Sequence, residues 1–583
     1  MHGGPVEPRR VSRQIAHRIG RLGPAAFAAL ASMAVLLAAP WMATAQGSDT
    51  TMPTVATTDY PIPPRALFVS PEGSDRSAGT RRRPLRTVSA ALTRARAGAT
   101  IVLRGGTYRE ALGTIDKTIT LQPYPGETAW LKGSIVVTGW RRNGSVWGHD
   151  GWSHAFCATC FHPGNIEKAN PQAGLPDQVF VDGRPLRQVV QRRDLVPGTF
   201  MVDSGRKQLL VGDDPTGRTV EAVIRDRALT LVRGSEGSLI RGIAFAHYSP
   251  TAEPGLGGMV KADAGGLAFE HNTFAFSAVK GLSIYGENAR VADNTFVSNG
   301  MMGLETYKAH GLEVTGNRFA NNNTEGFVQT GDVSEAAGAK IVTTRDVTIA
   351  DNWFEDNRAT GLWLDIDVVN ATVVRNVMRN NERHGLYFEI STRALIASNA
   401  FLGNGVSGVG LADATGARVL NNTFVDNPVA LLVQDDARDQ SDPAAFRKGS
   451  TWSSGDNMFR NNLVVGGMLA WVRDYTGRLD PANMLPSSDA NAYRPSPGVP
   501  AAEWWRAGRR VAFDTLADYG ARTKRERRSI LLDGNGRPID GNVGIDGDDL
   551  PSDFARAIGI SGVRPGIGAP LLPDGVEVPR LRR

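Results

Sequence analysis

The feature that most constrains this chain is a tripeptide, Asn-x-apolar, that recurs at a near-constant spacing through its second half. The asparagines lie mostly 22 to 24 residues apart, at Asn272, Asn294, Asn317, Asn352, Asn376, Asn399 and Asn422. A fixed period of this length is typical of solenoids, in which each repeat packs only against its neighbours. One coil of a β-helix needs about this length, so the repeat predicts an all-β fold, a right-handed parallel β-helix.

Each repeat also contains an alternating strand that opens nine residues after the asparagine. The opening residues are Gly281, Gly303, Gly326, Gly361, Gly385 and Gly408, with Leu431 in the last repeat. Residues one and three after the glycine are apolar, as in Leu362 and Leu364, and are expected to point into the solenoid. The asparagines and the phenylalanines that follow them are expected to stack from coil to coil, which is a structural role.

One repeat is longer than the others, because about 12 extra residues from Glu325 to Ala337 interrupt it. Two glycines, Gly326 and Gly338, could open its strand. Gly338 is favoured because the apolar residues on either side of Lys340 then point inward and Lys340 points outward. The extra segment then becomes a loop beside the sheet, where solenoids often carry function.

The first 45 residues have a different composition from the rest. Five arginines precede an apolar run from Ala25 to Ala39, and Ala43-Thr44-Ala45 follows, which predicts a cleaved signal peptide over residues 1–45. The run of 15 residues falls short of the roughly 20 needed to cross a bilayer. Cleavage removes five arginines and one glutamate, so the net charge falls from +6 to about +2. A secreted or extracytoplasmic protein is expected, with no membrane span in its mature form and no nucleic-acid partner.

The rest of the chain divides by its repeat pattern. We expect a linker at 46–65, an N-terminal cap and first coils at 66–177, and an inserted β-sandwich-like subdomain at 178–229. The main β-helix follows at 230–475, and a C-terminal coil, cap and tail at 476–583. Because an open solenoid end exposes its core, helices near 87–97 and 515–524 are expected to belong to the two caps.

The chain has two cysteines, Cys157 and Cys160, in a Gly- and aromatic-rich loop. In an exported chain this spacing favours a local disulfide. A redox motif would need a helix that starts after a strand, and a zinc site would need a second ligand pair beyond His154 and His162.

Outward-facing residues at the same position of successive strands form columns. The column four residues after each glycine reads Tyr285, Tyr307, Val342 or Thr330, Asp365, Glu389 and Ala412. Asp365 and Glu389 therefore occupy adjacent strands about 4.8 Å apart, close to the separation of the nucleophile and the acid/base in a retaining glycosidase. Two like charges at this distance predict that one pKa is raised, which suits a general acid.

The column two residues after each glycine offers Glu305, Lys340, Trp363 and Tyr387. Aromatic rings on a rigid sheet are expected to pack against the apolar face of a sugar, and Lys340 to hold a hydroxyl or carboxylate. Together with Tyr307 and Asp367, these residues are the candidate binding residues for a polysaccharide or oligosaccharide substrate.

Two other interpretations stay open. Asp365, Asp367 and Glu389 could hold Ca²⁺ through oxygen ligands, with Lys340 as the base of a polysaccharide lyase or uronate epimerase. The same charges could also belong to a non-catalytic carbohydrate-binding solenoid. The glycosidase interpretation requires no metal and no organic cofactor.

The segments Gly361-Leu-Trp-Leu-Asp-Ile-Asp367 and Gly385-Leu-Tyr-Phe-Glu-Ile-Ser391 resemble the paired strands of parallel β-helix glycoside hydrolases of the β-xylosidase type, in the pectate-lyase-like superfamily. The resemblance implies that Asp365 is the nucleophile and Glu389 the acid/base. That family also carries a β-sandwich insert, similar to the segment near 178–229. The sequence departs from the family pattern at Ile366-Asp367 and in the Glu325 to Ala337 loop, so the resemblance implies a reaction type and not a particular sugar.

Overall fold

The computed structural model describes residues 52–251, 257–329, 335–436, 438 and 451–534. All of them belong to one compact unit, Thr51–Arg583. The signal peptide expected at residues 1–45 lies outside the described residues. Over the described ranges, the longest and most apolar helix is still too short to span a bilayer.

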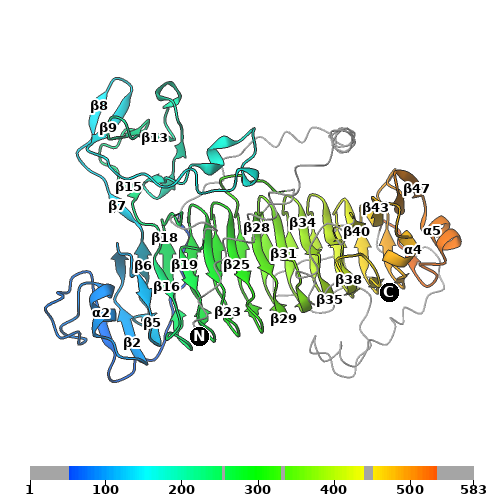
Figure 1. Ribbon diagram of the computed structural model, residues 1–583, viewed down its shortest axis with the longest axis horizontal. Coiled ribbons are helices and arrows are strands. Elements are labelled where there is room, and N and C mark those ends of the chain that lie inside the picture. Colours follow the sequence, from blue (N-terminus) through cyan, green and yellow to red (C-terminus); the bar gives the residue numbers. More distant parts are fainter. Residues whose placement is uncertain (1–51, 252–256, 330–334, 437, 439–450, 535–583) are drawn as a thin grey trace, which may run out of the picture. The chain divides into compact units, whose positions relative to one another are not determined.

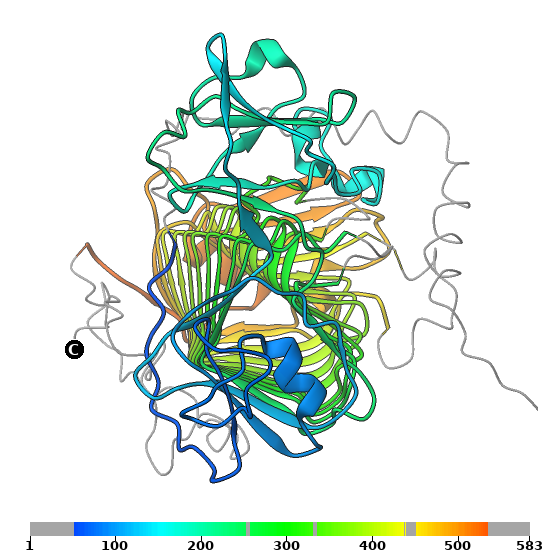
Figure 2. The ribbon, with the colours of Figure 1, turned by 90° about the vertical axis from the view of Figure 1, so that its left-hand side faces the viewer.

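Three sheets of 13 strands run side by side through this unit and build a right-handed parallel β-helix, as the repeat predicted (Figure 1). Figure 2, viewed from the end of the N-terminal cap, shows the three sheets as the walls of the coil. Each coil contributes one strand to each sheet, so paired strands in the body of the solenoid belong to consecutive coils and are not neighbours in sequence.

Sheet 1 carries the predicted columns. Its strands, in spatial order, are β4 (Thr114–Ile115), β16 (Leu229–Leu231), β19 (Val260–Ala262), β22 (Lys280–Ile284), β25 (Met302–Tyr307), β28 (Ala337–Val342), β31 (Thr360–Asp365), β34 (His384–Glu389), β37 (Ser407–Ala412), β40 (Val429–Asp435), β43 (Met468–Asp474), β46 (Ala502–Arg506) and β47 (Arg509–Phe513). All neighbours pair in parallel except the last two strands, which form an antiparallel pair.

Sheets 2 and 3 complete each coil. Sheet 2 consists of β1 (Leu67–Val69), β2 (Ala99–Leu103), β5 (Ile119–Pro123), β17 (Leu239–Arg241), β20 (Ala268–Glu270), β23 (Arg290–Ala292), β26 (Glu313–Thr315), β29 (Arg345–Ala350), β32 (Val369–Val374), β35 (Thr392–Ala397), β38 (Thr415–Leu420), β41 (Met458–Arg460) and β44 (Ser487–Asp489). Sheet 3 consists of β3 (Gly106–Tyr108), β6 (Ala129–Lys132), β18 (Ile243–Ala246), β21 (Thr273–Ala275), β24 (Thr295–Val297), β27 (Arg318–Ala320), β30 (Trp353–Glu355), β33 (Val377–Arg379), β36 (Ala400–Leu402), β39 (Thr423–Val425), β42 (Leu463–Val465), β45 (Ala492–Arg494) and β48 (Ile530–Leu531).

The predicted asparagine ladder stands at the turn from sheet 2 to sheet 3. The Asn376 amide donates to Oδ1 of Asn399 at 3.0 Å, and Oδ1 of Asn376 accepts the backbone N–H of Asn352 at 2.9 Å. The same contacts recur along the ladder, which continues past Asn422 to Asn462 and Asn491. Because these side chains are buried, the ladder satisfies polar groups that water cannot reach.

A second asparagine ladder, which the sequence analysis missed, stands at the turn from sheet 3 to sheet 1. It consists of Asn299, Asn322, Asn357, Asn381, Asn404 and Asn427, each five residues after a member of the first ladder. The Asn381 amide donates to Oδ1 of Asn404 at 2.9 Å. The recurrence of asparagine at this offset was the available signal.

Stacked phenylalanines fill the interior beside these turns, as predicted. The rings of Phe296 and Phe319 are nearly parallel with centroids 4.7 Å apart, and the centroids of Phe401 and Phe424 are 4.9 Å apart. This spacing matches the separation of the strands that carry the rings. Stacking therefore continues the core from coil to coil without a gap.

The strand register after the long repeat starts at Gly338, as predicted. β28 pairs Ala339 with Leu304 and Lys340 with Glu305, so Gly338 and not Gly326 opens this strand. Val342 then belongs to the column of Asp365, four residues after each glycine, and the alternative, Thr330, lies outside the described residues. Gly326 belongs to the loop before the strand.

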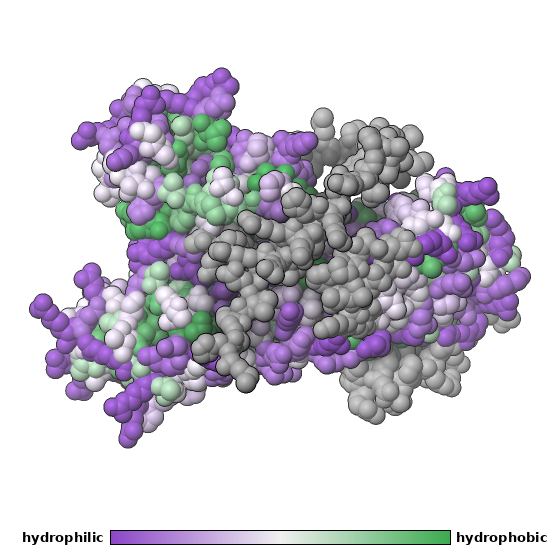
Figure 3. Space-filling view, viewed as in Figure 1, coloured by the Kyte–Doolittle hydropathy of each residue, from purple (hydrophilic) through white to green (hydrophobic). Residues whose placement is uncertain are grey.

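The N-terminal cap includes α2 (Val88–Arg94), whose N-cap Thr87 accepts a hydrogen bond from the backbone of Ala90. The opposite cap includes α4 (Pro481–Met484) and α5 (Leu516–Thr523), and α5 buries Tyr519 against Trp504. Both predicted cap helices are thus present, and both cover the apolar ends of the solenoid. The surface at both ends is mainly hydrophilic in the view of Figure 3.

The insert is larger than the predicted 178–229. One of its sheets has the order β11 (Arg184–Pro185), β10 (Val179–Val181), β15 (Val220–Val223), β7 (Ser134–Val136), and the other β12 (Arg187–Gln188), β13 (Thr199–Asp203), β14 (Gln208–Val211), β9 (Val146–Asp150), β8 (Arg141–Asn143). The two sheets share one apolar core, which makes the insert sandwich-like. The predicted boundary left out β7 to β9, because β7 and β9 pair with strands far along the chain and β8 pairs with β9, which the spacing of the repeats does not show.

Three short 3₁₀ helices belong to this region, η2 (Pro163–Asn165), η3 (Pro171–Gly174) and η4 (Arg192–Asp194). The buried Glu221 carboxylate ties the insert to the first coils, because Lys132 and Arg109 both form ion pairs with it. Burial raises the pKa of Glu221, but His247, Lys132 and Arg109 together lower it to about 2.

We predict that Asn376→Ala lowers the free energy of unfolding by about 1–3 kcal/mol, because it leaves buried backbone groups without partners. Denaturant unfolding measures the change. Asn483→Ala, which removes an exposed asparagine of α4, is the matched control and should change the stability by less than about 0.5 kcal/mol. Equal losses in the two variants would contradict a stabilising ladder.

Candidate active site

The structure brings the two predicted columns together on the outer face of sheet 1. In the first column Glu305, Lys340, Trp363 and Tyr387 are partners on successive strands. In the second column Val342 is the partner of Asp365, which ends β31, and Glu389 ends the adjacent strand β34. The two carboxylates thus stand on neighbouring coils about 4.8 Å apart along the stack.

The ammonium group of Lys340 lies between Asp365 and Trp363. Its Nζ is 3.0 Å from Oδ2 of Asp365 and 3.8 Å from the centroid of the Trp363 ring. A cation over the face of an indole and beside a carboxylate gains from both contacts. Lys340 therefore fixes Asp365 and Trp363 in one orientation.

Glu389 is held by two donors. The indole Nε1 of Trp363 donates to its Oε2 at 2.8 Å, and Arg438 donates to its Oε1. Burial raises the pKa of Glu389 to about 7, the charge of Asp365 raises it as well, and Arg438 opposes the shift. The predicted raised pKa therefore falls on Glu389, with burial as its main cause and the like charge as the second.

Arg438 is a site residue that the sequence analysis missed. Its guanidinium reaches three carboxylates, Glu389, Asp413 and Asp436, and its Nη2 is 2.6 Å from Asp413. Burial raises the pKa of Asp413 to about 8, although Arg438 lowers it. The residue lies outside every repeat, so its column position could not be read from the spacing.

Three neighbours position Tyr387. The imidazole of His384 stacks on its ring with centroids 4.5 Å apart, and Nδ1 of His384 is 2.8 Å from the Ser407 hydroxyl. Gln434 donates to the Tyr387 hydroxyl at 3.0 Å. Burial lowers the pKa of His384 to about 3, so this ring is neutral near pH 7 and supports the tyrosine by packing. On the next strand only a glycine fits, because a Cβ at Gly410 would meet the Tyr387 ring at 2.6 Å.

Glu305 and Tyr307 lie on the same face but do not contact the carboxylate pair. Glu305 forms an ion pair with the buried Lys280 at 2.5 Å and accepts a hydrogen bond from Tyr285 at 3.0 Å. Tyr307 is 40% exposed and packs against Lys308. The two residues could contact only a ligand that extends two coils beyond Asp365.

Asp367 does not join the pair, because the chain turns after Asp365. Ile366 and Asp367 both have positive φ, and Oδ1 of Asp367 accepts a hydrogen bond from the Trp452 indole at 3.1 Å. Over the described ranges the structure contains no group of three or more His, Cys, Asp or Glu side chains placed to hold a metal ion. The three carboxylates of the calcium interpretation each have a different nitrogen partner, which does not fit a shared Ca²⁺.

Two loops, which contain Cys157 to Asn165 and Phe327 to Val328, pack against each other beside the earlier coils of sheet 1. The Cys157–Cys160 disulfide forms, as predicted, within the first of them. The ring of Phe161 packs on that of Phe327 with centroids 5.1 Å apart, and the backbone N–H of Val328 donates to Asn165 at 3.0 Å. The segment that follows the insert's first strands thus packs against the long loop that interrupts the repeat.

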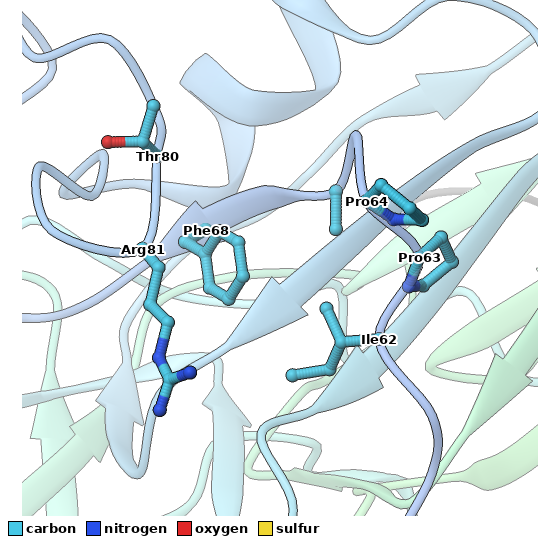
Figure 4. Close-up of a pocket in the computed structure, with 7 residues that line it drawn as sticks. Ile62, Pro63, Pro64, Phe68, Thr80 and Arg81 are labelled. Atoms are coloured by element: carbon cyan, nitrogen blue, oxygen red, sulfur yellow. The ribbon is translucent and has the colours of Figure 1, made fainter.

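A separate pocket lies at the N-terminal cap, away from these residues. Its lining residues are Ile62, Pro63, Pro64, Ala66, Phe68, Thr80 and Arg81 (Figure 4). Apart from Arg81 and the hydroxyl of Thr80, these side chains are apolar. The pocket therefore offers no pair of acid and base groups.

Comparison with known proteins agrees with the fold. A family model described as "Right handed beta helix region" matches residues 258–464, and one described as "Protein of unknown function (DUF1565)" matches residues 71–116. Two curated proteins match short segments: uncharacterized protein YwoF of Bacillus subtilis (strain 168), 42% identical over 76 residues, and pectate lyase PEL9 of Emericella nidulans, 40% identical over 74 residues. Each match covers 12% of this chain, and 16% and 18% of those proteins.

Solved structures resemble a much larger part of the chain. The complex of XylC with xylose matches with a TM-score of 0.58 and 19% identity, over 76% of this chain and 86% of that one. The pectate lyase Pel9A matches with a TM-score of 0.41 and 14% identity, over 88% of this chain and 96% of that one. The first of these likenesses places the chain among parallel β-helix proteins by fold.

We predict that Arg438→Met raises the pKa of Glu389 above about 7, because the variant removes the positive charge that opposes the shift. Carbon-13 titration measures it, with the Glu389 carboxyl resonance identified by its loss in Glu389→Gln. Arg418→Met, which breaks an ion pair with Asp456 on another sheet, is the control and should leave the pKa of Glu389 near 7. An unchanged pKa in Arg438→Met would show that this ion pair does not form in solution.

Proposed function

We propose that this protein is a carbohydrate-active enzyme, a retaining glycoside hydrolase that uses Asp365 and Glu389. The observation that carries the proposal is the contrast between two neighbouring carboxyl groups. Both groups are buried, but Asp365 is paired with the ammonium of Lys340, whereas Glu389, held by Arg438 and the Trp363 indole, has its pKa raised to about 7. Neighbouring acids with such different partners are suited to the separate roles of nucleophile and acid/base.

The reaction would proceed in two displacements. Asp365 attacks the anomeric carbon and forms a glycosyl ester, while the glycosidic C–O bond breaks and the Glu389 proton passes to the leaving oxygen. Glu389, now a carboxylate, takes a proton from water, and the water oxygen displaces Asp365 from the anomeric carbon. The configuration is retained, and Glu389 ends the cycle protonated.

The surroundings support a saccharide substrate. Tyr387 is half-buried beside the pair, with its ring centroid 5.9 Å from that of the buried Trp363, and aromatic rings pack well on sugar faces. A site of action outside the cytoplasm is part of the proposal, and the Cys157–Cys160 disulfide supports it because disulfides persist in oxidising compartments.

A calcium-dependent lyase or epimerase is the second candidate, because Lys340 lies on the same face. Its ammonium contacts a carboxylate and an indole face, which are contacts of a charged group, whereas a base must first lose its proton. The same catalytic assay separates the two candidates.

We predict that Asp365→Asn and Glu389→Gln each lower turnover of aryl glycosides or oligosaccharides by 10³-fold or more, on the order expected for residues that act as a unit. Purified protein is screened for reducing ends, with the product anomer followed by proton NMR. Asp346→Asn and Glu313→Gln are the controls and should keep full activity, because both change exposed carboxylates on strands of sheet 2. Full activity in either catalytic variant, or unsaturated uronate products that vanish with EDTA, would contradict the hydrolase.

We predict that kcat/KM of the wild type falls as the pH rises through about 7, because Glu389 must be protonated to act as the general acid. Rate profiles between pH 4 and 9 measure the limb. Arg438→Met should move this limb to higher pH, because the variant is expected to raise the pKa of Glu389. A limb that stays in place would assign the titration to another group.

A further inference from the structure

A second group of outward side chains lies on later coils of the same sheet. β43 provides Trp471 and Arg473, Tyr475 follows it, and β46 provides Trp505, the partner of Arg473. We call these four residues the Arg473 platform. Arg473 continues the column of the acid pair, which reads Asp365, Glu389, Ala412, Gln434, Arg473. It is three strands beyond Glu389, about 14 Å along the stack.

The guanidinium of Arg473 lies between aromatic rings. Its Cζ is 4.2 Å from the centroid of Trp471 and 4.7 Å from that of Tyr475, and the Trp471 and Trp505 rings meet edge to face at 6.3 Å. Tyr475 is 44% exposed. The platform is thus a preorganised cation framed by aromatic rings at the surface of the sheet.

Arg473 has no counterion among the described residues, unlike three other arginines of these coils. Arg438, Arg478 and Arg510 each form ion pairs with carboxylates. Within the described part of the chain Arg473 forms no ion pair, and its buried Nε has no hydrogen-bond partner, nor has the Nε1 of Trp471. Burial lowers the pKa of Arg473 accordingly. A partly buried cation without an anion is costly, so its retention on this face points to an anion that binds there.

Glu503, a carboxylate whose charge acts on Arg473, is already held by other donors. Glu503, one strand further on, accepts hydrogen bonds from Arg510 at 3.0 Å and from the Trp505 indole at 3.2 Å. Arg383, at the start of the Glu389 strand, likewise forms no ion pair with a described residue, and burial lowers its pKa. Among the described residues, two guanidinium groups that form no ion pair therefore lie close to Tyr387, whose hydroxyl stays neutral because burial raises its pKa.

We propose that the Arg473 platform is a subsite for a uronate, a carboxylate-bearing sugar unit of the oligosaccharide that the acid pair cleaves. The inference rests on the proposed function. A guanidinium binds a carboxylate through two parallel hydrogen bonds, and the surrounding rings pack on the apolar face of the sugar. The distance to Glu389 requires an oligosaccharide, because one sugar unit does not span three coils.

The test is equilibrium binding by calorimetry in the Glu389→Gln background, so that affinity is measured without turnover. The probes are oligogalacturonate, oligomannuronate and a glucuronate-substituted xylo-oligosaccharide, each beside its counterpart with the carboxyl groups reduced to alcohols. At least one acidic probe should bind tenfold or more tightly than its reduced counterpart, and Arg473→Met should abolish that preference. Methionine keeps a flexible apolar cover on the rings, so the fold is expected to tolerate it.

Two further variants sharpen the result. Arg473→Lys keeps the charge and should retain part of the preference. Arg509→Met, which removes an exposed arginine of β47, two strands beyond Arg473, should leave the affinity within twofold. Failure of every acidic probe to bind, equal affinity for acidic and reduced probes, or an unchanged preference in Arg473→Met would overturn the subsite. The hydrolase itself would stand or fall separately, on the turnover of neutral and acidic substrates by the wild type.

Discussion

The stacking of parallel strands about 4.8 Å apart is the constraint on which the rest of the structure depends. Two buried asparagine ladders, one on either side of sheet 3, fix this spacing, since each side-chain amide reaches the next coil at about 3 Å. A slip by one residue would turn every inward leucine of a strand outward and would break both ladders. The position of an outward side chain is therefore determined by its place in the repeat, because the hydrogen bonds of the ladders allow little variation in the spacing of the coils.

This rigidity allows charges to be placed where they would otherwise be avoided. Asp365 and Glu389 stand on adjacent coils because the ladders hold them there, and the cost of their proximity is met in two ways. Both are buried; Lys340 neutralises Asp365, and the pKa of Glu389 is raised to about 7. Arg438 then limits that rise, so the protonation of Glu389 is set by a balance between burial and a cation that comes from outside the repeat.

Most of the fold and the centre of the site could be predicted from sequence, because both follow from periodicity. The period predicted the solenoid, the inward leucines, the choice of Gly338 and the columns with Asp365, Glu389 and Trp363. Features without a period were missed or misplaced. The partners of β9 lie 58 to 64 residues later and those of β7 lie 85 to 89 residues later, and Arg438 reaches Glu389 across 49 residues of chain. Such contacts depend on how irregular segments fold back onto the solenoid, and the spacing of the repeats in the sequence does not predict this.

Asp367 shows why sequence proximity misleads on such a face. It is two residues from Asp365, yet the left-handed backbone at Ile366 and Asp367 ends the strand and directs its carboxylate to Trp452. Arg473 shares a column with Asp365 and Glu389, although more than 80 residues of chain separate it from Glu389 and more than 100 separate it from Asp365. The distance between two outward side chains on this sheet depends on the number of coils between them and not on the number of residues. Residues of one column can therefore contact one extended ligand. The compensated charges near Asp365 and the uncompensated guanidinium of Arg473 then differ in role, because the first group already has its partners within the protein and the second has none among the described residues.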